Sequence, residues 1–418
     1  MSASLLRPAL VLGLLSAVGP FAIDMYLPAM PEIGADLGAG IPAMQGTIIS
    51  YFIAFGLAQL IYGPWADQAG RKVPIYAGLV IFLIGTLICT FAPNTEALLA
   101  GRFVQGLGGA AVMVVPRAVI RDLSTGHEAT RMMAAIMMVI SVSPFLAPLV
   151  GAGLMAVAGW RAIFGALVVA TLASLLMTRF LLQETLPPES RQPVSLRATL
   201  AGARHLLSHK GFMALTFLGG FGMASFFVFL ASASFVYAQD FGLNPTQFSL
   251  AFALNALGFF SASQVAARLG MRFGAQKVMV RATMGFAAFA IGLFGVALMG
   301  GATLWVTMAG LFLANACLGL VIPTAMVMAL EEHGPIAGLA SSLGGTMQML
   351  AGGVMIAAAS PFFDGSVTPM LGAIALCAGL ALVLALVVAR LPAAQAPGSS
   401  TTGTSTPGTS TTGTSASA

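Results

Sequence analysis

Apolar segments of about 20 residues recur along this chain and alternate with short polar connections. A helix of that length rises about 30 Å, which matches the hydrocarbon thickness of a bilayer. The segments are continuously apolar and lack the alternation that marks the strands of a membrane barrel. The pattern predicts twelve membrane-spanning helices, at 8–28, 46–66, 74–93, 97–119, 132–155, 161–182, 211–237, 247–267, 278–299, 303–329, 337–360 and 368–390.

The longest internal polar connection divides these twelve spans into two sets of six. It contains Pro187 and Pro188 and several charged residues, as linkers between bundles do. The last 26 residues are rich in Thr, Ser and Gly and carry no charge, so they cannot bury a core. We therefore expect an all-α membrane protein of four parts: an N-terminal six-helix bundle (1–183), a cytoplasmic linker (184–210), a C-terminal six-helix bundle (211–391) and a disordered tail (392–418).

Composition strengthens this interpretation. Lys, Arg, Asp and Glu make up 7% of the 418 residues, where a soluble domain carries about a quarter, and the mean hydropathy is +0.95. These values exclude a soluble enzyme, a nucleic-acid-binding protein and a disordered chain. If the N-terminus is cytoplasmic, 16 of the 18 basic residues lie in the inner connections or at their flanks, so we expect both termini inside.

Motifs for catalysis or metal binding are absent from the sequence. The cysteines Cys89, Cys317 and Cys377 lie in apolar runs without ligand spacing, and no Gly-Lys pair exists to form a nucleotide-binding loop. His127 and Glu128 begin a zinc-protease pattern that lacks its second histidine. We expect no enzyme activity, no metal site and no cofactor.

Three segments resemble elements of the major facilitator superfamily. Residues 63–72 resemble its G-x-x-x-D-R-x-G-R-R/K signature, with Gln68 in place of the arginine. Residues 102–108 resemble its R-x-x-Q-G-x-G element, and residues 147–153 resemble its G-P-x-x-G-G antiporter motif with two glycines replaced by alanine. This resemblance implies two six-helix halves with a transport site between them.

Further segments are similar to one branch of that superfamily, the Bcr/CflA drug-resistance transporters. They are residues 24–31, 117–123 and 159–164, and the resemblance extends over all of the chain except the tail. It implies a proton-coupled exporter of small drug-like molecules in the bacterial inner membrane, driven by the proton gradient without a cofactor. We expect its partners to be a small-molecule substrate and the lipid bilayer, with no nucleic acid, and we expect a monomer.

Asp24 and Arg102 are the charges placed most clearly within spans. By helical rise both lie at a similar depth, and a charge there is costly unless it faces a cavity or a partner. We hypothesise that Asp24 binds the coupling proton, and that Arg102 acts beside it with Gln105 on the same helical face. The alternatives are a hydrated carboxylate at the outer mouth and an arginine that only binds backbone carbonyls.

The resemblance also implies a cytoplasmic gate, in which Asp67 lies near a helix N-terminus of the other half and Arg71 pairs with Asp122. The alternative is that these charges only set the topology. The predicted gate residues are Gly63, Asp67, Gly70, Arg71, Arg121 and Asp122.

In the antiporter motif, Pro148 removes a backbone hydrogen bond, and Gly151 and Gly153 permit a close helix crossing. These residues predict either a bend that seals the outer cavity or ordinary helix packing.

Aromatic, Met and amide side chains in the spans are candidates for an adaptable substrate cavity, although such residues also face lipid or core. The candidates are Tyr51, Phe55, Gln105, Met223, Phe226, Phe229, Phe235, Asn255 and Gln348. Together these features favour a proton-coupled exporter. A metabolite exporter or uniporter on the same fold, and a membrane receptor or channel, remain as alternatives.

Overall fold

The computed structural model describes residues 3–124, 126–191, 195–331 and 333–390. Across these ranges the chain forms α-helices and short 3-10 helices and no strand. Twelve helical segments of this described part are long and apolar enough to cross a membrane. The predicted fold class, an all-helical membrane protein with twelve spans, is confirmed.

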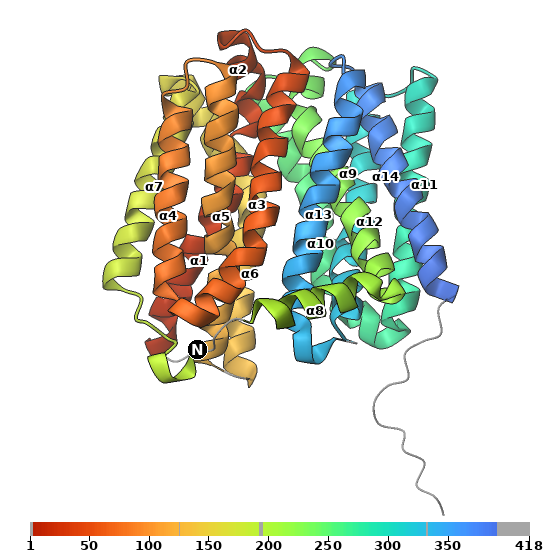
Figure 1. Cartoon of the computed structure of the whole chain (residues 1–418). Helices are drawn as coiled ribbons and strands as arrows, with labels where there is room; N and C mark the ends of the chain where they lie inside the picture. The colour runs from red at the N-terminus through yellow and green to blue at the C-terminus, as the bar shows by residue number, and fades with distance from the viewer. Residues whose placement is uncertain (1–2, 125, 192–194, 332, 391–418) are drawn as a thin grey trace, which may run out of the picture.

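The first six spans form one bundle (Figure 1). Its elements are α1 (Ala3–Asp24), the 3-10 helix η1 (Leu27–Ala29), α2 (Met30–Asp36), α3 (Ile41–Ala69), α4 (Lys72–Thr90), α5 (Thr95–Leu123), α6 (Gly126–Ala158) and α7 (Arg161–Phe180). A short 3-10 helix, η2 (Pro188–Ser190), follows this bundle.

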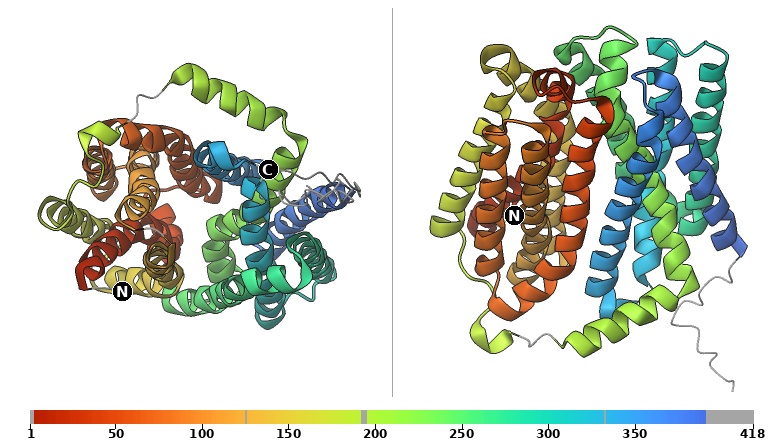
Figure 2. Two further views of the ribbon diagram at one scale, coloured as in Figure 1. Left: turned by 90° about the horizontal axis from the view of Figure 1, so that it is seen from below. Right: turned by 45° about the horizontal axis from the view of Figure 1, so that its top comes forward.

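The last six spans form the second bundle, which lies beside the first. Its elements are α9 (Lys210–Gln239), α10 (Pro245–Phe273), α11 (Ala275–Leu298), α12 (Leu304–Glu331), η3 (Gly334–Ile336), α13 (Ala337–Ala359), η4 (Ser360–Phe362) and α14 (Val367–Arg390). The two bundles meet mainly where α3 packs on α13 and α6 packs on α10. Seen along the spans, each bundle is a separate cluster of helices joined along these two seams (Figure 2, left).

The first span departs from the prediction that it ends near residue 28. Its regular helix stops at Asp24, and the chain then continues through η1 and α2 to Asp36 as part of one apolar segment. Pro28 and Pro31 lie in the first turns of η1 and α2, positions that a proline favours because its missing N–H would be unpaired there. The remaining predicted spans overlap the observed helices, with ends that differ by a few residues.

The connection between the two bundles contains a helix that the sequence did not predict. Helix α8 (Leu196–Ser208) begins where the Ser195 hydroxyl accepts a hydrogen bond from the Ala198 N–H at 3.3 Å. It lies across the lower end of the bundles in Figure 1, opposite α2. We call these two ends of the molecule the α8 end and the α2 end. The predicted tail, 392–418, lies outside the described residues.

Candidate functional site

Arg102 is fully buried in the N-terminal bundle, and its guanidinium group lies between two aromatic rings. Its Cζ atom is 4.7 Å from the ring centroid of Tyr26 and 4.6 Å from that of Tyr51. One terminal nitrogen donates hydrogen bonds to the Ala22 carbonyl at 3.0 Å and to Gln105 Oε1 at 2.6 Å. The negative faces of the two rings stabilise the cation where no water reaches it. The cationic side chain of Arg102 is therefore buried among residues of α1, α3 and α5.

Hydrogen bonds extend this site to neighbouring helices. The Gln105 side-chain amide donates to the Thr86 hydroxyl at 2.9 Å on α4, and the Tyr51 hydroxyl donates to the Gly19 carbonyl at 3.4 Å on α1. A side chain at Gly106 would collide with the backbone carbonyl of Tyr51. Only a glycine there lets α5 approach α3 closely enough to place Arg102 against the Tyr51 ring.

Asp24 lies at the last residue of α1, where the regular helix breaks. Its side chain is buried, and Oδ2 accepts a hydrogen bond from the Ser143 hydroxyl of α6 at 3.0 Å. Among the described residues Asp24 forms no ion pair with Arg102. Arg102 instead binds the carbonyl of Ala22, two residues before the carboxylate. Asp24 and Arg102, the two charges predicted to act together, are therefore not in direct contact. Arg102 binds the last turn of α1, the helix that ends at Asp24.

The predicted antiporter motif lies in α6, against this break in α1. A Cβ atom at Gly151 would collide with the backbone carbonyl of Met25, so the predicted close crossing exists at this glycine. The same prediction is wrong for Gly153, which is exposed and has open space around it. Pro148 is buried within α6, which continues through it from Gly126 to Ala158.

At the α8 end, Arg71 pairs with both predicted gate acids. Its guanidinium group contacts Asp67 at 2.6 Å and binds both carboxylate oxygens of Asp122, at 2.7 and 3.1 Å. The pairing of Arg71 with Asp122 that the resemblance implies is confirmed. The bond between Asp67 and Arg71 lies within the N-terminal bundle, and no hydrogen bond or ion pair of the described residues joins Asp67 to the other half.

Glu184 completes this network, and no sequence motif singled it out. Its carboxylate accepts hydrogen bonds from the backbone N–H groups of Arg71 at 2.8 Å and Lys72 at 3.1 Å. Burial opposes the charged form, but these bonds and those from Leu186 and Thr185 outweigh it and lower the pKa of the carboxyl.

The other predicted gate residues have different surroundings. Gly70 has a φ of 92°, and a Cβ atom there would lie 2.8 Å from a Glu184 carboxylate oxygen, so both the backbone and the contact require glycine. Gly63 has open space around it. Arg121 is exposed and takes no part in the ion pairs of the described residues.

The nine predicted cavity residues lie in separate places. Tyr51, Phe55 and Gln105 belong to the Arg102 region, where the Phe55 ring stacks on Tyr51 at 5.9 Å. Three others are buried in the C-terminal bundle: Phe229, Phe235 and Asn255. Met223 and Phe226 are half-buried on α9.

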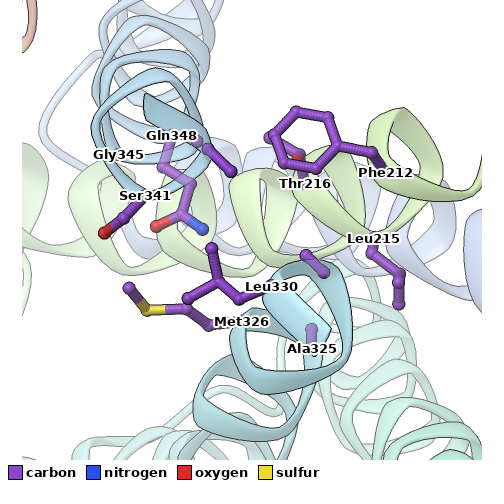
Figure 3. Close-up of a pocket in the computed structure, with 12 residues that line it drawn as sticks. Phe212, Leu215, Thr216, Ala325, Met326, Leu330, Ser341, Gly345 and Gln348 are labelled. Carbon is purple, nitrogen blue, oxygen red and sulfur yellow. The ribbon is translucent and has the colours of Figure 1, made fainter. Parts of the chain in front are cut away.

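Gln348 lies in the wall of a pocket at the α8 end of the C-terminal bundle (Figure 3). The pocket has a volume of about 40 Å³ and lies between α9, α12 and α13. Its described lining is mostly apolar, with the hydroxyls of Thr216 and Ser341 and the amide of Gln348 as polar groups and no charged side chain. A space of this size holds a water molecule or two and no drug-sized ligand.

The two bundles are bonded to one another in the middle of α3 and towards the α2 end. The Gln45 side-chain amide donates to the Ser232 hydroxyl at 3.2 Å, and the Phe52 ring stacks on Phe227 with centroids 4.1 Å apart. The Thr346 hydroxyl of α13 donates to the carbonyl of Gly56 at 2.7 Å. No hydrogen bond joins the two bundles nearer the α8 end in the described residues. The molecule is thus held closed at the α2 end.

Comparison with known proteins agrees with this architecture. Residues 12–237 match the family model described as Major Facilitator Superfamily. The chain is 30% identical to the bicyclomycin resistance protein homolog of Haemophilus influenzae, over 88% of this chain and 92% of that protein. It is 31% identical to multidrug resistance protein D of Escherichia coli, over 83% of this chain and 86% of that protein.

A solved structure shares the fold. The crystal structure of a D-xylose–proton symporter superposes with a TM-score of 0.73 at 14% identity, covering 93% of this chain and 98% of that one. With twelve spans in two bundles, the signature residues at the α3–α4 connection and these relatives, the chain belongs to the Major Facilitator Superfamily of membrane transporters and groups there with the Bcr/CflA-type drug-resistance proteins.

Proposed function

We propose that this transporter exports small amphiphilic, drug-like molecules from the cytoplasm in exchange for protons. It works in the bacterial inner membrane as a monomer, with both termini in the cytoplasm, and the proton gradient is its energy source without a cofactor. The resistance names of its relatives support the substrate class. The distribution of lysine and arginine supports the orientation.

The observation that carries the proposal is the position of Asp24. A buried carboxylate within a membrane span is a functional group by default, because burial without a role is costly. Asp24 accepts a hydrogen bond from Ser143 of α6 and lies where α1 gives way to η1. Helix α6 also contacts α10 of the other bundle, so relative movement of the bundles changes the surroundings of Asp24.

Antiport follows if proton and substrate stabilise different states of this site. A bound proton neutralises Asp24, and a bound substrate favours the charged carboxylate, so the two exclude one another. Release of the proton to the cytoplasm leaves Asp24 charged, which is the form that binds substrate.

The test is efflux in a bacterial host that lacks its own drug pumps. We expect the protein to raise resistance and dye efflux, an uncoupler to abolish both, and Asp24→Asn to abolish efflux at unchanged expression. Asp364→Asn, on an exposed connection, is the matched control and should export normally. Efflux that is insensitive to the uncoupler would contradict antiport and favour a uniporter.

A further inference from the structure

Helix α8 packs on the C-terminal bundle with one face only. Leu206 is fully buried beside Phe212 of α9, and Gly202 lies against Leu339 of α13. Seen from the α8 end, the helix lies outside the outline of the two bundles, along the seam between α3 and α13 (Figure 2, left). A helix in this place runs along the membrane surface at the level where the spans end.

The opposite face of α8 is both apolar and basic. Leu200 is 70% exposed and Leu207 is 46% exposed, and their spacing of seven residues places them on the same face. Arg197 and Arg204 have the same spacing, are also exposed, and lie beside the leucines on the helix surface. Exposed leucines bordered by arginines are typical of helices that lie in a membrane interface.

The sequence of α8 and its flanks carries charge of a single sign. Between residues 191 and 210 it holds four basic residues, from Arg191 to Lys210, and no acidic one. On the surface of α8 the exposed Leu200 and Ala201 lie beside Arg204, His205 and Ser208. An apolar surface next to a cation and a hydroxyl fits the boundary between the acyl chains and the headgroup phosphates of a phospholipid.

We propose that α8 is an interfacial anchor that binds anionic phospholipids. Leu200 and Leu207 enter the boundary of the acyl chains, and Arg197 and Arg204 bind headgroup phosphates. In the cell this is the cytoplasmic leaflet, an assignment that rests on the proposed orientation. Lipid is the occupant because this face of α8 lies at the end of the spans, faces away from the bundle that α8 packs on, and holds exposed arginines and no acidic residue of the helix.

Backbone hydrogen exchange of residues 196–208 tests this in the intact transporter. The protein is placed in nanodiscs of phosphatidylcholine alone or of phosphatidylglycerol alone, so the same lipid faces both sides and the result does not depend on orientation or transport. We expect exchange of α8 to be slower in phosphatidylglycerol, by about fivefold for each arginine. Arg197→Gln with Arg204→Gln should remove the difference.

Two further variants separate lipid binding from misfolding. Arg272→Gln removes the same charge from an exposed residue at the end of α10 and should keep the lipid difference. Leu200→Ser with Leu207→Ser should raise exchange of α8 in both lipids while exchange in the spans stays unchanged. Equal exchange of α8 in the two lipids, or a lipid difference that survives the double arginine substitution, would overturn the proposal.

Discussion

Arg102 illustrates how this chain keeps a charge inside the bilayer without an ionic partner. The guanidinium carbon lies within 4.7 Å of the ring centroids of Tyr26 and Tyr51, and one terminal nitrogen donates to both the Ala22 carbonyl and Gln105. The planar, weakly hydrated guanidinium group suits contact with aromatic rings better than the compact ammonium group of lysine. Arg102 is therefore suited to fix the end of α1, where Asp24 lies.

Arg102→Lys should therefore reduce efflux more than it reduces stability. The ammonium group keeps the charge but has no planar face to lie against the two rings and is more strongly hydrated, so we expect efflux to fall by tenfold or more, about 1.4 kcal/mol. Uncoupler-sensitive efflux and thermal unfolding in detergent measure the two effects. Arg179→Lys, exposed on α7, is the control. Unchanged efflux and pH profile in Arg102→Lys would show that the residue only fills space.

Glu184 gives a pH prediction at the same scale. The pKa of its carboxyl group is lowered in the folded protein. Its charged form therefore stabilises the network around Arg71 at pH values above the ordinary glutamate pKa of about 4.3. That stabilisation is lost as the pH falls through the lowered value. We expect Glu184→Gln to unfold roughly 1–2 °C below the parent protein at neutral pH, with the difference vanishing in acid. A difference that persists at pH values low enough to protonate Glu184 in both the folded and the unfolded protein would be inconsistent with this role.

Among the helices, α6 is the element that connects the predicted antiporter motif to Asp24, the proposed proton site. Ser143 donates to Asp24, and Gly151 lies against the carbonyl of Met25, one residue further along the chain. One helix thus contacts both sides of the break in α1. If α6 moves against α10, the hydrogen bond from Ser143 to Asp24 changes even when the backbone of α1 stays the same.

Gly151→Ala and Gly153→Ala form a matched pair on this helix. The first places a methyl group against the Met25 backbone, which cannot move freely, and overpacking of this kind costs about 1–3 kcal/mol. We expect a lower unfolding temperature and reduced efflux. The second points into open space and should leave both properties unchanged or slightly raise stability. Equal behaviour of the two variants would exclude a specific role for the crossing at Gly151.

Sequence patterns predicted these elements unevenly, for physical reasons. The spans follow from length and hydropathy alone, and Asp24 and Arg102 stand out because charges are rare there. The break after Asp24 was missed because the run through Leu27 and beyond stays apolar. Helix α8 was missed because thirteen residues with two arginines carry no span signal. Phe229 and Asn255 are buried, and hydropathy alone cannot distinguish a core position from a cavity wall, so their place in a substrate cavity stays a prediction.

At the scale of the whole molecule, the bundles are bonded together at the α2 end and lack such bonds at the α8 end of the described chain. Gln45 with Ser232, and Phe52 with Phe227, hold the closed side. Alternating access requires these contacts to separate while others form at the opposite end. Among the described residues the hydrogen bonds between the bundles are few, and each contributes about 1 kcal/mol, which suits a transporter that must exchange two states.

A reversible cross-link tests this requirement. Gln45→Cys with Ser232→Cys places two thiols where side-chain atoms now lie 3.2 Å apart across the bundle interface. Oxidation should stop efflux, and reduction should restore it, because the α2 end can no longer open. Each single-cysteine variant under the same oxidation is the control. Full efflux with the cross-link formed would show that this end need not open.

Whether Asp24 holds the proton that the substrate displaces can be measured directly. Purified transporter in weakly buffered solution is mixed with a compound whose efflux in cells proves sensitive to the uncoupler, and released protons are followed with a pH indicator. We expect proton release by the parent protein and by Asp364→Asn. We expect none by Asp24→Asn, in a preparation shown to be folded. Equal proton release from Asp24→Asn would contradict this role of Asp24.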